Sequence, residues 1–190
     1  AMSSGRFEYA HKLLEKAANA DALSTSALSL NGRLYLHEYE TTLDKNRDLL
    51  LHAETCLQSA IERNNAAFKD FEHLTDIYHQ LAEIPAEQDK ADWLSKAFGT
   101  ASQAIERYPG CGRLHFKQAQ IADKLGDVEI AIEQYKKAIE IEDEYRAQFR
   151  RMYPEREDVV SRLDKNMYLY AKERIAELSM KFELLFLPEY

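Results

Sequence analysis

The sequence contains few of the residues that break helices, crosslink small domains or span membranes. Its 190 residues include two cysteines, four prolines and six glycines. Cys56 and Cys111 have no metal-ligand spacing, so they indicate neither a disulfide framework nor a zinc site. No apolar run approaches the length of about 18 residues that a membrane-spanning helix needs. We therefore exclude a disulfide-stabilised domain and expect no direct membrane insertion of this segment.

Positive charge is also in deficit. The chain has 25 Lys and Arg against 33 Asp and Glu, and its formal net charge is −8. General nucleic-acid binding needs a broad cationic surface, so we expect no nucleic-acid partner. One local basic segment would suit an acidic peptide or a lipid headgroup. We prefer the interpretation that it is a solvated helix end, where arginines lie near backbone carbonyls. Its arginines are Arg146, Arg150, Arg151, Arg156 and Arg162.

Residue patterns typical of active sites are missing as well. The six histidines have no HExxH or Cys/His spacing, and we interpret them as surface residues. Ser24, Ser26 and Ser29 lack a GxSxG context, and helix N-capping by Ser24 or Ser26 accounts for this cluster. No glycine-rich phosphate loop or catalytic carboxylate pair is found. The sequence therefore predicts no enzyme activity, with no catalytic, cofactor-binding or metal-binding residue and no cofactor.

The chain has instead a repeated spacing of alanines. Residues seven apart share one face of a helix, where two small side chains let a neighbouring backbone approach closely. A third residue lies between each pair, at i+4. This pattern, followed by a turn, is typical of the second helix in a stacked helix–turn–helix repeat and predicts an all-α fold. The four pairs are Ala10/Ala17, Ala53/Ala60, Ala97/Ala104 and Ala131/Ala138, and the residues between them are Leu14, Leu57, Ala101 and Tyr135.

Residues 112–145 have the most specific pattern. Leu125-Gly126-Asp127 separates two helical segments, and the second segment follows AIxxYxKAIxI from Ala131. This segment resembles the tetratricopeptide repeat family, although His115 and Gln118 replace the usual bulky residues. The resemblance implies a right-handed α-α superhelix, a solenoid that acts as a non-catalytic scaffold for protein–protein interaction.

The same register predicts the organisation of the chain. Residues 1–145 form a tetratricopeptide-like array, and residues 146–190 form a C-terminal helical cap that ends in a capping helix. The array comprises a half repeat at residues 6–22 and repeats at about 25–65, 68–109 and 112–145. Ala1 before Met2 is interpreted as a residue left by expression, so we expect the natural chain to continue upstream.

The resemblance also implies where a peptide binds. In this family the first helices of the repeats line a concave face that holds extended peptides. Phe116 is expected to be the apolar contact on that face. Arg113 and Lys117 match, in charge and spacing, two residues with which some members clamp a terminal carboxylate, but Ser29, Arg33 and His73 do not match the rest of that clamp. The full predicted site is Arg33, His37, Lys69, His73, Asp76, Arg113, Phe116, Lys117 and Gln120.

Two functions remain open. The first is an adaptor in the cytoplasm that binds a protein or peptide and associates as a homodimer through its unpaired end helix, Arg6–Ala20. The second follows from residues 145–178, which are similar to the repeat tails of bacterial O-antigen ligase-like membrane proteins. Under that alternative, catalysis would lie in an upstream membrane domain, and this part would be its soluble tail.

Overall fold

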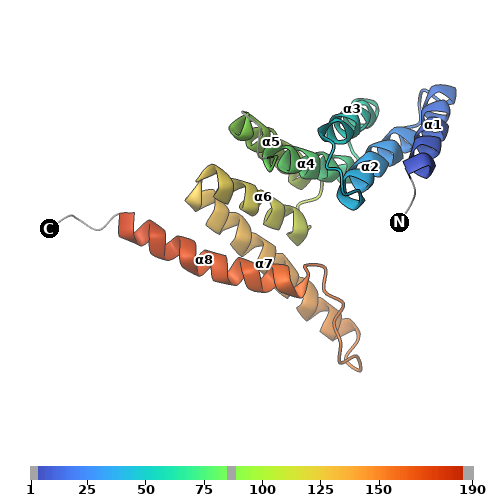
Figure 1. The fold of residues 1–190 in the computed structure, drawn as a ribbon. Helices are drawn as coiled ribbons and strands as arrows, with labels where there is room; N and C mark the ends of the chain where they lie inside the picture. Colours follow the sequence, from blue (N-terminus) through green and yellow to red (C-terminus); the bar gives the residue numbers. More distant parts are fainter. Residues whose placement is uncertain (1–3, 85–88, 186–190) are drawn as a thin grey trace. The chain divides into compact units, whose positions relative to one another are not determined.

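The computed structural model describes residues 4–84 and 89–185, and within these ranges the chain is helical and contains no strand (Figure 1). The predicted all-α fold is therefore confirmed. By contacts the chain divides into two compact units, residues 1–107 and 108–190, which are described in turn. The helices are α1 (Ser4–Ala20), α2 (Ser26–Thr41), α3 (Arg47–Arg63), α4 (Phe68–Ala82), α5 (Lys90–Arg107), α6 (Gly112–Leu125), α7 (Val128–Met152) and α8 (Lys165–Leu185).

The first unit consists of two helix pairs and an edge helix. Helix α2 packs against α3, α4 packs against α5, and α3 contacts α4, while α1 packs on α2 (Figure 1). The alanine faces of α3 and α5 are completely buried, as predicted. Their core residues are Ala53, Leu57 and Ala60 in α3, and Ala97, Ala101 and Ala104 in α5.

Glycine lies opposite an alanine face in each unit. A Cβ atom added to Gly32 of α2 would lie 2.7 Å from Leu57 Cγ and 3.1 Å from the Ala53 carbonyl oxygen of α3. A Cβ atom at Gly112 of α6 would lie 3.0 Å from the Ala138 carbonyl oxygen of α7. All three distances are shorter than ordinary carbon contacts, so the two helix pairs approach as closely as their backbones allow.

The second unit is built on the α6–α7 pair. Ala131, Tyr135 and Ala138 of α7 are completely buried, which confirms the alanine face predicted there. Gly126 ends α6 with φ 84°, a left-handed conformation that glycine adopts without steric cost. The Asp127 carboxylate then accepts a hydrogen bond from the Ile130 amide and caps α7. The predicted boundary at residue 145 lies within α7, and the division into repeats and a cap stays a prediction.

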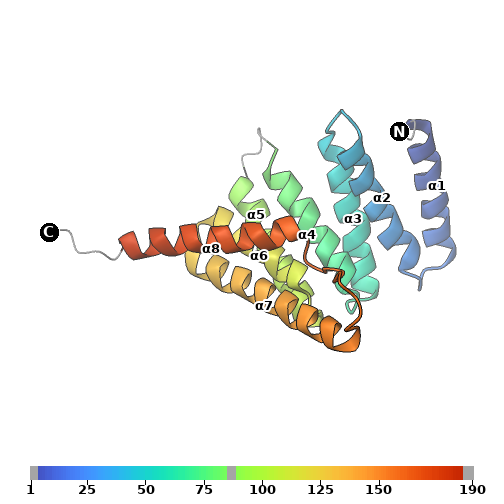
Figure 2. The ribbon, with the colours of Figure 1, turned by 90° about the horizontal axis from the view of Figure 1, so that it is seen from below.

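Helix α8 covers the α6–α7 pair, as predicted for a capping helix, and packs on α7 (Figures 1 and 2). Ala171 and Leu178 are its buried apolar residues. The Arg174 guanidinium donates two hydrogen bonds to the Asp123 carboxylate of α6, at 2.6 and 2.8 Å. This bidentate pair holds α8 and also sets its orientation, because each of the two guanidinium nitrogens must face its own carboxylate oxygen.

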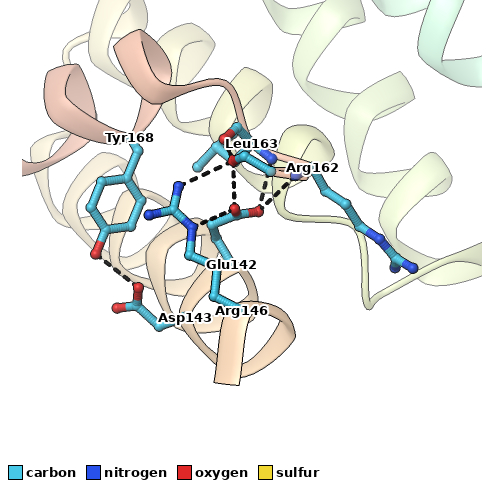
Figure 3. Close-up of polar contacts among 7 residues, drawn as sticks. Glu142, Asp143, Arg146, Arg162, Leu163 and Tyr168 are labelled. Carbon is cyan, nitrogen blue, oxygen red and sulfur yellow. Dashed lines mark hydrogen bonds and ion pairs between the residues drawn. The ribbon is translucent and has the colours of Figure 1, made fainter. Parts of the chain in front are cut away.

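A buried carboxylate holds the segment that leads into α8 (Figure 3). Glu142 of α7 accepts hydrogen bonds from Arg146 Nε at 2.7 Å, Ser161 Oγ at 2.5 Å, and the backbone amides of Arg162 and Leu163 at 3.2 and 2.8 Å. Burial acts to raise the pKa of Glu142, but the hydrogen bonds from Ser161, Arg146 and Leu163 outweigh it, so the pKa is lowered. Glu142 is therefore held as a carboxylate.

The predicted register is wrong in α1. Ala17 is exposed, and the residues that α1 buries are Phe7, His11 and Ala18. The helix is turned because burying the larger Phe7 and His11 side chains against α2 removes more apolar surface from water than burying two alanines would.

We predict that Ala138→Leu destabilises the second unit by about 1–3 kcal/mol, since the added side chain has no space where α6 crosses α7. Ala147→Leu is the matched control, because Ala147 is exposed on the same helix. The measurement is chemical denaturation followed by helical circular dichroism. Equal stability of the two variants would contradict the assigned packing.

We predict that Glu142→Gln lowers stability at pH 7 by about 1–3 kcal/mol, because buried donors lose a charged acceptor. The folded pKa is lowered from 4.5. The contribution of the carboxylate is therefore fully present above that pH and is lost as the pH falls through the folded pKa. The difference between wild type and variant should shrink when the pH is lowered from 7 to below 4.5. An equal difference at both pH values, or a similar loss in the exposed Glu144→Gln, would contradict this role.

Candidate functional site

Four of the nine predicted site residues line one groove in the first unit. Arg33 and His37 come from α2, and His73 and Asp76 come from α4. The two members of each pair are three or four residues apart on their helix, so they face the same side. The groove has a volume of about 420 Å³.

The groove combines an apolar lining with charges of both signs. Leucines from α2 form the apolar part, and Glu40 adds a second carboxylate to that of Asp76. Arg33, His37 and Glu40 are spaced i, i+4 and i+7, which places them along one face of α2. The complete lining is Leu30, Arg33, Leu34, Leu36, His37, Glu40, His73 and Asp76.

A hydrogen bond to a buried carboxylate joins α2 to α4. Ser29 Oγ of α2 donates to the Asp70 carboxylate of α4, and Asp70 is buried. Glu72 of α4 is also buried. Helix α4 is therefore covered on more of its circumference than a helix at the edge of an array.

Phe116 does not lie on an open face. Only 3 % of its surface is exposed, and its ring packs edge-to-face against Tyr135 of α7 and Tyr170 of α8, with centroids 5.6 and 5.9 Å away. The expectation that Phe116 offers an apolar contact to a peptide is therefore wrong. Helix α8 covers this residue, and an aromatic ring in such a cluster contributes to the core.

The remaining predicted residues lie elsewhere on their helices. Lys69 is exposed on the first turn of α4. In the second unit, Arg113 is exposed on α6, and Lys117 and Gln120 are half-buried. Their role in binding stays a prediction.

Sequence reasoning missed Leu30, Leu34, Leu36 and Glu40. For Glu40 a signal was available, because it lies seven residues after Arg33 and three after His37, on the same face of α2. The leucines gave none, because an apolar residue on a helix is expected in the core. Leu30 is nevertheless 49 % exposed, at the rim of the groove.

The interpretation of the histidines as surface residues is wrong for His11 and His115, which are both buried. His11 Nδ1 lies 2.6 Å from Asn31 Oδ1, and its Nε2 lies 3.0 Å from Glu38 Oε2. The His11 ring also stacks on Tyr35 of α2 at 3.6 Å. Because Asn31, Tyr35 and Glu38 all belong to α2, this histidine attaches α1 to the rest of the unit.

The described residues contain neither a metal-binding group nor a membrane-spanning helix. Among them, no group of three or more His, Cys, Asp or Glu side chains is arranged to hold a metal ion. No helix in residues 4–84 or 89–185 combines the length and the apolar character needed to cross a membrane.

Comparison with solved structures identifies the architecture. The chain is similar to a crystal structure of MamA protein, with a TM-score of 0.60 and 17% identity over 98% of this chain and 90% of that one. It is also similar to TTC0263, a thermophilic tetratricopeptide repeat protein of Thermus thermophilus, with a TM-score of 0.57 and 21% identity over 96% and 92%. The fold is that of a tetratricopeptide repeat protein.

At this level of identity the likeness concerns the fold of the tetratricopeptide-like chain alone. No protein-family profile matches the chain, and no curated protein sequence does. These comparisons give no support to the resemblance between residues 145–178 and the tails of O-antigen ligase-like proteins.

Proposed function

We propose that this tetratricopeptide-like chain is a non-catalytic scaffold that binds a peptide segment of another protein in the α2–α4 groove. The observation that carries the proposal is the convergence of Arg33, His37, His73 and Asp76 on one groove. These residues belong to two different helix pairs, so the groove depends on the stacking of one pair on the next. Stacked helix pairs commonly use such surfaces for binding.

The chemistry of the groove favours a particular kind of peptide. The exposed part of Leu30 and the neighbouring Leu34 suit an apolar side chain, while Arg33 lies beside them and suits a carboxylate. Asp76 and Glu40 suit a basic residue further along the same segment. Charges placed in this way select the partner and steer its approach more than they add to affinity.

Three further aspects belong to the same proposal. Lys69 of α4 and Arg113, Lys117 and Gln120 of α6 are proposed to add polar contacts to a bound protein. Two copies of the chain are proposed to associate through α1. We place this scaffold in the cytoplasm.

The experiment identifies the peptide first and then tests the groove. A photo-crosslinking amino acid replaces Leu30 at the rim of the groove or, as a matched control, Leu23, which is 92 % exposed in the α1–α2 loop. The peptides of interest are those in cell extracts that crosslink to position 30 but not to position 23. They are sequenced by mass spectrometry, synthesised and titrated against the purified chain. We expect a segment with an apolar residue flanked by an acidic and a basic one.

Arg33→Glu should weaken binding of that synthetic peptide about tenfold, because it places a like charge beside the peptide carboxylate. Lys136→Glu makes the same change in charge on an exposed position of α7 and should leave the affinity unchanged. Equal binding by wild type and Arg33→Glu, or the same crosslinked peptides from positions 23 and 30, would refute the groove as the binding site.

A further inference from the structure

One face of α1 is left uncovered within the residues that the structure describes. Tyr9 and Leu13 are 66 % and 47 % exposed there, although both are large and apolar. Ala10 is partly exposed, and Ala17 is exposed. Arg6, Ala10, Leu13 and Ala17 follow the spacing of a single helical face, beside the face by which α1 packs on α2.

The same arrangement of small residues is covered by a helix elsewhere in the molecule. In α3 the alanine pair Ala53/Ala60 is buried against α2, and in α7 the pair Ala131/Ala138 is buried against α6. The alanines in those helices allow a partner backbone to approach closely, as the glycines opposite them show. The face of α1 that carries Ala10/Ala17 therefore has the form of a helix-packing surface.

We propose that this face packs against the same face of α1 in a second copy of the chain, with the two helices antiparallel. This inference rests on the proposed self-association and specifies its geometry. With a two-fold axis between positions 13 and 14, Ala10 of each copy lies opposite Ala17 of the other. Leu13 of each copy then packs next to the axis, where its exposed surface is removed from water.

Charge complementarity selects the second copy and the antiparallel direction. In this register Arg6 lies opposite Asp21 of the other copy, and the symmetry repeats the pair at the other end. Both side chains are exposed. The Asp21 carboxylate is held at the end of α1 by the Leu23 and Ser24 backbone amides, which donate to it at 3.0 and 3.2 Å. A parallel arrangement would instead place Arg6 beside Arg6 and Asp21 beside Asp21.

The interface consists of one helix from each copy. Stable complexes usually bury at least about 1,200 Å², so we expect an interface of this limited extent to give a weak dimer whose population depends on concentration.

The first test is a charge exchange followed by sedimentation equilibrium. Arg6→Asp alone and Asp21→Arg alone each create two like-charge pairs and should weaken dimerisation about tenfold. Mixing the two variants restores both opposite-charge pairs, so the mixture should dimerise like wild type. Lys12→Asp makes the same change in charge on another side of α1 and should have no effect.

The second test is disulfide crosslinking in a background in which Cys56 and Cys111 are replaced by alanine. Ala10→Cys and Ala17→Cys proteins should form a crosslinked dimer when mixed, and neither should do so alone. Crosslinking of either protein with itself would overturn the antiparallel register. A wild-type dimer that none of these substitutions affects would overturn this interface but leave self-association in place. A chain that stays monomeric at all concentrations would overturn both, while peptide binding in the α2–α4 groove is tested separately.

Discussion

The structure depends on pairs of helices that approach each other at faces made of alanine. At the crossing of α2 and α3, Gly32 lies against Leu57 and the Ala53 carbonyl, and at the crossing of α6 and α7, Gly112 lies against the Ala138 carbonyl. These contacts set how far α2 stands from α3. Since α4 packs on α3 and contacts α2, the same distance decides where the side chains of α2 and α4 meet to form the groove.

Buried polar groups attach the outer helix of each unit. His11 joins α1 to Asn31 and Glu38 of α2, and Glu142 together with the Arg174–Asp123 pair holds α8 and the segment before it. A polar group that is buried without partners costs free energy, so each of these groups permits few alternative positions of its helix. Apolar packing thus builds the helix pairs, and polar contacts position the helices at their ends.

Much of the fold could be predicted, and part of the candidate site. The alanine faces of α3, α5 and α7 follow from periodicity, since only one apolar stripe on each helix has small residues at i and i+7. In α1 two stripes lie side by side, one through Ala10 and Ala17 and one through Phe7, His11 and Ala18. Periodicity alone does not say which of the two is buried. Arg33, His37, His73 and Asp76, predicted on one face of the array, line one groove, while their role in binding stays a prediction.

The helices, the turn at Gly126 and the small residues at which helices cross all follow from the amino-acid sequence. These are local properties, set by spacing along one chain segment and by the conformations that each residue permits. Tertiary structure alone decided that Phe116 is covered by Tyr170 of α8, that Glu72 and His11 are buried, and that α1 turns Ala17 outward. Burial depends on which helices, distant in sequence, come to lie side by side, and the pattern of a single helix does not contain that information.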